Sequence, residues 1–541
     1  TRSIGGPQIL SWRIDTPLVD YTVGPDLSVL RRRSPRGLAS IHQALTQARG
    51  DDQIEGLAVY IQTAGFGFGK AQELRSLLGS FKAAGKPVEC YLETAGEGTN
   101  GTLAYYLATA CSRIYLSPLG DWNVVGLYAD SPFIRGTLDK LRIDPQFLHV
   151  GDYKSAAELY TETEHSPAAE EALGAVLDDL YDQIVTAISE TREISPEKVR
   201  ELIDLAPLGA EQALADGLID EITYPDLFEE HLVGADKRPL VSLDDYLVTP
   251  AGFGNQRVAV VFAQGTIVRG GNGTDSWSQQ RYVGAESMRQ ILRPLVEDSG
   301  LAGVVVRVDS PGGSAVASDL ILREMELLAA EKPVVVSMSD VAASGGYYIS
   351  AKAAKIVAEP ATITGSIGVV GGKLATRRFQ EELLGVTHDT LQRGANADFY
   401  SSLDTFSPEQ EARFLAGMTR VYDVFVGHVA EGRQMSRAEV ENVAGGRIWT
   451  GRQALENGLI DEVGGLDRAI EIVLESAGLD PGEPVELDFY PRPPSLFELL
   501  SQSLSPFMDA RNLPFSLLPA LRVPHALELP PDLVDLLSSG R

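Results

Sequence analysis

The sequence predicts an α/β protein made by tandem duplication of one domain, with mostly parallel β-sheets whose strands are joined by crossover helices. The first observation is a repeated peptide, since QALADGLIDEI at 212–222 returns as QALENGLIDEV at 453–463, an offset of 241 residues. The second is that residues 104–127 align with 346–369 at an offset of 242. Such long matches at nearly one offset indicate two copies of one domain. The third is that β-branched runs of strand length alternate with amphipathic segments.

The strand-length runs occur in the same order in both copies. Nearly continuous apolar runs of this kind are typical of parallel strands that are buried on both faces of a sheet. The expected strands are GLAVYIQ (56–62), PVECYLE (87–93) and RIYLSP (113–118) in the first copy, and VAVVFAQGTIV (258–268), GVVVRVD (303–309), PVVVSMS (333–339) and KIVAEP (355–360) in the second, with a helical pattern at 317–330.

Each copy also carries a long helix opened by Ser-Pro, with Ser166 or Ser407 as the N-cap and proline at the first helical position. Turn-forming residues cluster at 235–256 and mark a boundary. We therefore expect a first domain over residues 1–240, a second over 250–490, and a Pro- and Leu-rich extension over 491–541. The extension is expected to be a surface-packed tail, with an interfacial segment as the alternative.

Composition excludes several classes of protein. The formal net charge is −29, which disfavours nucleic acid as a partner because phosphate contacts need clustered Lys and Arg. Cys90 and Cys111 are the two cysteines of the chain, and this number implies neither a stabilising disulfide nor a metal site. The sequence contains no run of 18 or more apolar residues and no signal-peptide pattern at its start, so we expect no transmembrane segment.

A glycine pair follows one buried strand of the second copy. The run ending at Asp309 continues as Ser310-Pro311-Gly312-Gly313, directly before a predicted helix. Adjacent glycines at a helix start let backbone N–H groups point outward, where they stabilise developing negative charge. The pattern predicts an oxyanion hole at Gly312 and Gly313, with an ordinary turn as the alternative.

One strand later, Ser344 lies between two alanines and two glycines, at the start of another predicted helix. Small neighbours let a peptide backbone approach closely, and the Gly345 N–H is a candidate second oxyanion donor. Tight packing alone is the alternative. The first copy has Thr102 at the matching position, and QTAGFGFG in place of the Pro-Gly-Gly motif. Because the fold recurs while these motifs differ, a chemical role for Ser344 is favoured.

The candidate base is a lysine of the first copy. Lys154 lies in FLHVGDYKSAAELY, whereas the matching segment of the second copy, TLQRGANADFY, has Asn396 or Ala397 at that place. A lysine acts as a general base only if its pKa falls from about 10.4 towards neutrality, which burial at a domain interface would cause. The sequence is compatible with Ser344 meeting Lys154 of its own chain or of a neighbouring chain.

At these residues the sequence resembles the long, duplicated form of the bacterial and plastid signal peptide peptidases, the protease IV family. The resemblance covers residues about 40 to 490 and is carried by YKSAAE around Lys154, DSPGG, SDVAASGGYYIS around Ser344, and TGSIG around Ser366. It implies a fold of the ClpP/crotonase type and a catalytic dyad of Ser344 and Lys154. It also implies an oxyanion held by the Gly313 and Gly345 N–H groups, and a lysine amine oriented by Ser366.

The resemblance further implies what the protein acts on and where. Its substrates would be cleaved signal peptides and other short hydrophobic peptides, hydrolysed through an acyl-enzyme without a cofactor or metal. The family's enzymes are membrane-associated homo-oligomers, so we expect a tetramer at a membrane surface of the cell envelope, in the plasma or thylakoid membrane.

Two alternatives use the same fold. A crotonase-type enzyme would employ the oxyanion hole to stabilise the thioester enolate of an acyl-CoA, and would need carboxylates near the reacting carbon in place of Ser344 and Lys154. A non-catalytic oligomeric scaffold would need neither residue. Retention of both residues favours the peptidase.

Overall fold

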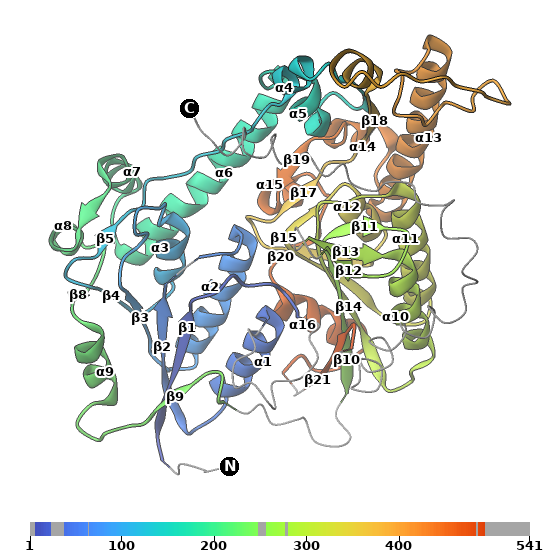
Figure 1. The fold of residues 1–541 in the computed structure, drawn as a ribbon. Coiled ribbons are helices and arrows are strands. Elements are labelled where there is room, and N and C mark those ends of the chain that lie inside the picture. The colour runs from blue at the N-terminus through green and yellow to red at the C-terminus, as the bar shows by residue number, and fades with distance from the viewer. Residues whose placement is uncertain are drawn as a thin grey trace, which may run out of the picture. The chain divides into compact units, whose positions relative to one another are not determined.

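The computed structural model describes residues 6–22, 37–62, 64–246, 256–275, 280–482 and 485–492 of the 541-residue chain. Two large sheets, one from each copy of the repeat, organise these residues (Figure 1). All of them except Arg492 belong to one compact unit, so contacts between the two copies are contacts within that unit. The predicted class, α/β with mostly parallel sheets, is confirmed.

The first copy forms a six-stranded sheet in the order β8-β4-β3-β2-β1-β9, in which every neighbouring pair is parallel. Its three predicted strands are present as β2, β3 and β4. Strand β1 was not predicted, because Ser11 and Arg13 interrupt its apolar run. The strands are β1 (Gln8–Ile14), β2 (Ile54–Ile61), β3 (Val88–Leu92), β4 (Arg113–Leu116), β8 (Glu221–Ile222) and β9 (Leu240–Ser242), while β5 (Asp121–Trp122) and β7 (Leu208–Gly209) form a separate antiparallel pair.

The second copy forms an eight-stranded sheet whose main path is β19-β17-β15-β14-β10-β21, with β16 pairing to β15 and β20. All of its pairs are parallel except β17 with β19. Its predicted strands are likewise present, except that the run expected at 258–268 is divided at Gly265, where φ is 101°, between this sheet and a smaller one. The strands are β10 (Arg257–Gln264), β14 (Leu301–Ser310), β15 (Val334–Ala343), β16 (Lys355–Ala358), β17 (Ile363–Gly365), β19 (Ile448–Thr450), β20 (Glu462–Val463) and β21 (Glu486–Tyr490), beside a small sheet of β11 (Thr266–Val268), β12 (Gly273–Thr274) and β13 (Arg281–Gly284).

Helices bury their apolar sides against these sheets. In the first copy, α1, α2, α3, α6 and α7 share one core with the sheet. In the second copy, α10 to α14 cover one face and α16 packs on the other. The helices are α1 (Leu38–Arg49), α2 (Phe68–Ala83), α3 (Thr102–Ala108), α4 (Arg135–Lys140), α5 (Glu158–Thr161), α6 (Pro167–Arg192), α7 (Pro196–Leu205), α8 (Ala210–Ala215), α9 (Pro225–Val233), α10 (Ala285–Glu297), α11 (Ala315–Ala329), α12 (Gly345–Ser350), α13 (Pro408–Arg433), α14 (Arg437–Val443), α15 (Gly451–Glu456) and α16 (Leu466–Ser476), with single turns η2 (Ser155–Ala157) and η3 (Phe379–Leu383).

Both predicted Ser-Pro helix starts are confirmed. The Ser166 hydroxyl accepts a hydrogen bond from the Ala169 N–H, and the Ser407 hydroxyl accepts one from the Gln410 N–H, each at 3.2 Å. Proline follows each serine at the first helical position, where no N–H is required.

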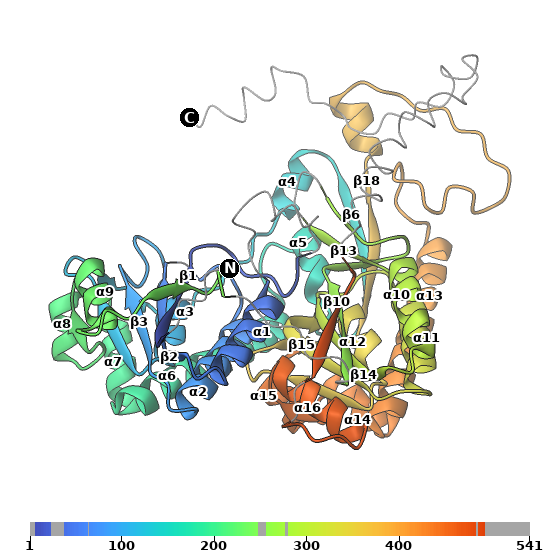
Figure 2. The same ribbon diagram turned by 90° about the horizontal axis from the view of Figure 1, so that it is seen from below.

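An antiparallel ladder joins the two copies. Strand β6 (Asp144–Val150) of the first copy pairs along its whole length with β18 (Val369–Ala375) of the second (Figure 2). Strand β6 ends four residues before Lys154, and β18 begins three residues after Ser366. The ladder therefore brings the lysine-bearing loop of one copy to the serine-bearing turns of the other.

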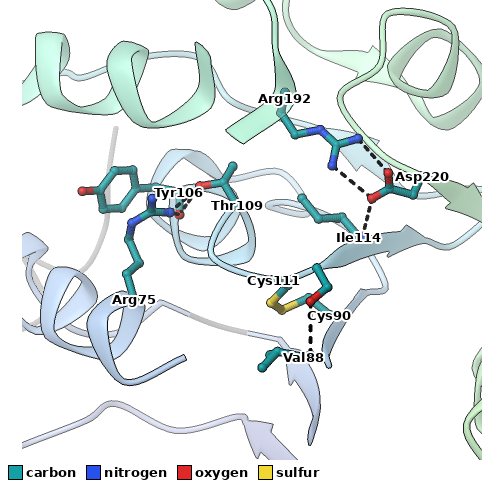
Figure 3. The surroundings of a disulfide bond; sticks show 10 residues. Arg75, Val88, Cys90, Tyr106, Thr109, Cys111, Ile114, Arg192 and Asp220 are labelled. Atoms are coloured by element: carbon teal, nitrogen blue, oxygen red, sulfur yellow. Dashed lines mark hydrogen bonds and ion pairs between the residues drawn. A yellow bond between two sulfur atoms is a disulfide. The ribbon is translucent and has the colours of Figure 1, made fainter. Parts of the chain in front are cut away.

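The two cysteines correct one expectation from the sequence. Cys90 of β3 and Cys111, which follows α3, form a disulfide with their Cα atoms 5.9 Å apart (Figure 3). Two cysteines without a spacing pattern carry no pairing signal, whereas the parallel pairing of β3 with β4 brings these residues together. The nearby end of α3 is held by the Arg75 guanidinium, which donates to the Tyr106 carbonyl and the Thr109 hydroxyl.

Within the ranges that the structure describes, no helix has the length and apolar character needed to cross a membrane.

Candidate active site

Lys154, Ser344 and Ser366 meet in one place, within a single chain. The Lys154 Nζ lies 3.0 Å from the Ser344 Oγ. It also donates to the Ser366 carbonyl oxygen at 2.8 Å and lies 2.9 Å from the Ser366 Oγ. One amine of the first copy thus contacts two serines of the second.

The Lys154 amine is buried without an acidic partner. Lys154 is only 6% exposed, and the partners of its Nζ are two hydroxyls and a carbonyl. Burial disfavours the charged form and lowers the pKa of Lys154 to about 8. A substantial fraction of the amine is therefore neutral at mildly alkaline pH.

Ser344 occupies a strained turn between β15 and α12. Its φ of 54° and ψ of −116° lie outside the regions that residues with a side chain favour. The turn is held by a hydrogen bond from the Ser344 N–H to the Gly365 carbonyl (2.9 Å) and by one from the Tyr348 N–H to the Ser344 carbonyl (2.8 Å). Ser366 also has a positive φ, of 52°. The backbone thus holds both hydroxyls in fixed positions beside the amine.

Two backbone N–H groups near Ser344 donate no hydrogen bond among the described residues. Gly313 forms a bridge to Ile267, in which the Gly312 carbonyl accepts from the Ile267 N–H and the Ser314 N–H donates to the Ile267 carbonyl. The Gly313 N–H itself has no partner among the described residues. The Gly345 N–H belongs to the first residue of α12 and has no intrahelical acceptor. A Cβ on Gly345 would lie 3.1 Å from the Gly313 nitrogen, so the two donors are neighbours and a side chain would intrude between them.

Gly312 makes a different contact. Its N–H donates to the Ser310 Oγ at 3.1 Å, and that hydroxyl donates to the Gly265 carbonyl at 2.6 Å. Its φ of 102° and the closeness of Ser344, whose Cβ would lie 2.8 Å from a Cβ at 312, explain why glycine is present. Gly312 therefore shapes the turn, while its N–H is directed at Ser310.

The lysine loop rests on a glycine pair that the sequence reasoning did not include. The Tyr153 N–H donates to the Gly445 carbonyl at 2.8 Å, and a Cβ on Gly446 would lie 2.5 Å from the Lys154 Cα. Both glycines have positive φ. A Gly-Gly pair ahead of a strand is a recognisable turn signal, but nothing in the sequence links it to Lys154.

A cavity of about 420 Å³ opens beside Lys154 and Ser366. Most of its wall comes from the first copy, and it combines an apolar part with polar residues that include the carboxylates Asp130 and Glu158. His165 lies in this wall and packs edge-on against Phe133, while His149 bonds to the Gly151 carbonyl, so neither histidine takes part in the contact with Ser344. The apolar part of the lining comprises Pro132, Phe133, Ala156, Leu159, Ala169, Ala172, Leu173 and Ile448.

In each copy, the position that matches a residue of the Ser344–Lys154 contact has different surroundings. Thr102, the counterpart of Ser344, is buried and donates its hydroxyl to the Gly126 carbonyl at 3.1 Å. Asn396 and Ala397, the counterparts of Lys154, lie in an exposed loop. Among the residues described, no group of three or more His, Cys, Asp or Glu side chains is arranged to hold a metal ion.

A serine hydroxyl next to a buried amine is a known variant of the Ser-His-Asp arrangement. On a duplicated ClpP/crotonase-like fold, this site defines a serine protease. The model of peptidase family S49 matches residues 80–232 and 326–480, one match in each copy. The chain belongs to peptidase family S49.

Named proteins with related sequences align with most of the chain. It is 34% identical to the chloroplastic serine protease SPPA of Arabidopsis thaliana, over 87% of this chain and 70% of the relative. It is 32% identical to protease 4 of Salmonella typhi, over 88% and 77% of the two chains. It is 34% identical to protease 4 of Haemophilus influenzae, over 79% and 71%.

The lowered pKa of Lys154 predicts the pH dependence of activity. A protonated amine cannot accept the serine proton, so kcat/KM for a peptide substrate should rise with pH through an apparent pKa near 8. Lys154→Met should lower kcat/KM by about 10² to 10⁴ and abolish this limb. The exposed Lys140 is the matched control, and Lys140→Met should leave the profile unchanged. A limb near 8 that survives in Lys154→Met would contradict the role of this amine.

The packing of Gly446 predicts a second effect on the lysine loop. Gly446→Ala would place a methyl group against the Lys154 backbone, at a φ of 89° that favours glycine. Displacing the amine should lower kcat by about 10-fold or more, while the substrate KM changes little. Gly427→Ala, which adds its methyl to open space on α13, should retain wild-type kcat in the same assay. Equal kcat values for the two variants would show that Gly446 does not set the lysine position.

Proposed function

We propose that this serine protease is an endopeptidase with a Ser344/Lys154 dyad, which degrades cleaved signal peptides and other short hydrophobic peptides. The observation that carries the proposal is the 3.0 Å contact between the Lys154 Nζ and the Ser344 Oγ. The first domain, residues 1–240, supplies the base, and the second, residues 250–490, supplies the nucleophile and the oxyanion hole.

The hydrogen bonds around Lys154 fit a neutral base. A neutral amine has two N–H groups and one lone pair. The Ser366 carbonyl and hydroxyl oxygens accept the two N–H groups, which leaves the lone pair for the Ser344 hydroxyl proton. Ser366 thereby orients the amine.

The reaction follows from this arrangement. The Lys154 amine takes the hydroxyl proton as the Ser344 Oγ attacks the carbonyl carbon of the scissile peptide bond. The resulting oxyanion accepts hydrogen bonds from the Gly313 and Gly345 N–H groups. The ammonium then protonates the leaving amine, and an acyl-enzyme remains. Water attacks this ester while Lys154 takes the water proton, and collapse of the second tetrahedral intermediate returns a proton to Ser344.

The substrate class is supported by the cavity wall and by the relatives. The apolar part of the lining beside Lys154 offers contacts to apolar side chains of a substrate. A related protein of Enterococcus faecium, 36% identical over 221 residues, is named a putative signal peptide peptidase. Signal peptides are hydrophobic segments that remain in or near a membrane, so we place the enzyme at a membrane surface of the cell envelope, in the plasma or thylakoid membrane. The Pro- and Leu-rich extension lies outside the described residues from 493 onward.

The repeat also supports a homo-oligomer, which we propose to be a tetramer built head to tail. Glycines 151 and 394 correspond at an offset of 243, which makes residues 387–393 the counterpart of β6. At the offset of 242, residues 127–133 are the counterpart of β18. Neither counterpart is in a strand, and both are largely exposed. A second copy of the chain could therefore pair its 387–393 with 127–133, repeating the β6–β18 ladder between chains.

Exposed apolar residues of helix α11 support the same head-to-tail arrangement of chains. The N-caps of α2 and α11, Gly67 and Ser314, correspond at an offset of 247, so Val316 and Leu320 match Gly69 and Glu73. The latter two face the other copy within the chain, since a Cβ on Gly69 would meet the Ser339 carbonyl and Glu73 pairs with Arg307. Val316 and Leu320 are instead 60% and 53% exposed, as expected of a face that a neighbouring chain covers.

Ser344→Ala tests the nucleophile. Hydrolysis of a leucine-rich fluorogenic peptide should fall by about 10³-fold or more, because the acyl-enzyme cannot form. A fluorophosphonate should label Ser344 in the unsubstituted protein, and the label, located by mass spectrometry of the modified peptide, should be absent from the variant. Thr102→Val, which removes the matching hydroxyl of the first copy, should retain both activities. Undiminished hydrolysis by Ser344→Ala would exclude the proposed mechanism.

Leu391→Arg tests the proposed ring. Leu391 is 90% exposed in the segment that corresponds to β6, and a buried guanidinium at a chain interface would be costly. The variant should shift the mass measured by light scattering from the tetramer towards the monomer. Leu119→Arg changes a leucine that is 95% exposed outside both segments, and should leave the mass unaltered. A tetramer that persists in Leu391→Arg would assign the interface to another surface.

A further inference from the structure

The turn that carries Ser344 and the turn that carries Gly312 and Gly313 begin where the neighbouring strands β15 and β14 lose their regular pairing. Val308 of β14 pairs with Met338 of β15, but the next pair is Ser310 with Ala342. One residue of β14 therefore lies opposite three residues of β15. From these ends the chain runs directly to Gly313 on one side and to Ser344 on the other. The spacing of the strand ends thus sets the distance between the serine hydroxyl and the Gly313 N–H.

A buried lysine of the first copy holds the two irregular ends together. The Lys70 Nζ donates to the Asp309 Oδ2 and to the Asp340 Oδ2, each at 2.6 Å. Because both carboxylates contact one nitrogen, their Oδ2 atoms lie within about 5.2 Å of each other. Without the ammonium, two carboxylates this close would repel and separate the strand ends. The Lys70 side chain is only 4% exposed, so water and salt screen these contacts weakly.

The two aspartates are also fixed to the backbone. The Asp309 Oδ1 accepts a hydrogen bond from the Val341 N–H at 3.2 Å, across the irregular part of the ladder. Asp340 accepts from the Gly67 N–H (3.0 Å) and from the Lys70 N–H (2.8 Å). Asp340 therefore caps the start of α2, whose own N-cap, Gly67, has no side chain for this purpose. The helix of one copy is anchored on the strand that leads to Ser344 in the other.

Three aspartates keep Lys70 protonated. Burial opposes that charge, yet Asp20, Asp309 and Asp340 together raise the pKa of Lys70 above its usual value. Asp20 lies 3.3 Å from the Lys70 Nζ and also pairs with Arg307 at 2.8 Å. Lys70 therefore remains an ammonium across the whole pH range in which Lys154 loses its proton.

The first copy lacks this arrangement at its own turns. At the offset of 247, Lys70 matches Ala317 of α11, and Asp309 matches Gln62, which donates to Glu93. The ammonium of Lys70 and the carboxylate of Asp309 are therefore found beside the turn that carries Ser344, and at this offset neither has a counterpart beside the turn that carries Thr102.

We infer that Lys70 is a positioning residue, which acts through Asp309 and Asp340 to set the oxyanion hole against Ser344. This inference rests on the proposed function, because it assigns a role to the same site. The Lys70 Nζ contacts Asp20, Asp309 and Asp340, and Lys154 is not among its partners. The first copy thus contributes two lysines with different roles: Lys154 moves a proton, and Lys70 holds the turns at their working distance.

Lys70→Met removes the ammonium while it keeps most of the side chain. The expected result is a kcat lowered by about 10- to 100-fold with KM within about threefold of wild type, since the hole acts on the transition state. A leucine-rich peptide aldehyde reports on the hole directly, because its adduct with Ser344 places an oxygen against the Gly313 and Gly345 N–H groups. Its inhibition constant should rise by the factor by which kcat/KM falls. The pH limb of Lys154 should stay near 8, which separates loss of the hole from loss of the base.

Three further variants complete the test. Lys70→Arg keeps the charge and should retain activity within about threefold. Lys82→Met, at the end of the same helix, should behave as wild type. If Lys70→Met fails to fold, Lys70→Met combined with Asp309→Asn and Asp340→Asn removes the repulsion. The triple variant should still show the lowered kcat and the weakened aldehyde binding, because it also lacks the two hydrogen bonds by which the Lys70 Nζ ties the strand ends together.

A failure of the Lys70 role and a failure of the proposed function would give different results. Wild-type kcat and aldehyde binding in Lys70→Met, or in the folded triple variant, would overturn the role of Lys70, as would a loss confined to the melting temperature. Failure of the proposed function would appear elsewhere, as peptide hydrolysis by the unsubstituted protein that does not depend on Ser344.

Discussion

A lysine amine becomes a base near neutral pH only where it is buried away from carboxylates, and the surroundings of Lys154 meet this condition. The contacts of its Nζ are two hydroxyls and one carbonyl, and burial is the cause that lowers its pKa. Lys70 is buried to a similar extent but contacts three aspartates, and its pKa moves in the opposite direction. The fold therefore separates a lysine that can release its proton from one that retains it, although both come from the first copy and both approach the serine-bearing turns of the second.

Duplication makes this division possible. In the second copy, the strand ends carry Ser344 and the glycine turn, while the segment that corresponds to the lysine loop is exposed and has no base. In the first copy, Thr102 has bonded its hydroxyl to a carbonyl, and the lysine is retained. The β6–β18 ladder then holds the two specialised copies in contact. The site is thus a property of the interface between copies, and neither half contains all of its groups.

The strands and helices with strong local signals could be predicted from the sequence, as could the pairing of Ser344 with Lys154, which follows from the asymmetry between copies. Contacts between distant segments that no such comparison of the copies links could not be predicted. The run QFLHV at 146–150 is strand-like in the sequence and lies in β6, but nothing in this run indicates that β18 is its partner. The disulfide depends on the pairing of β3 with β4, and the Lys70 contacts depend on the packing of α2 against strands of the other copy. Gly312 was predicted as an oxyanion donor, but its N–H is taken by Ser310, a detail of turn geometry.

The β6–β18 ladder has a genetic consequence. It brings the Ser344 hydroxyl and the Lys154 amine together within one polypeptide. Under the proposed dyad, a cell that expresses one allele lacking the serine and another lacking the lysine gains no working enzyme from mixed assemblies. Intragenic complementation is therefore closed to this protein, whereas it is open to single-copy enzymes that build such a site between subunits. Selection then acts on both halves of the gene as one unit.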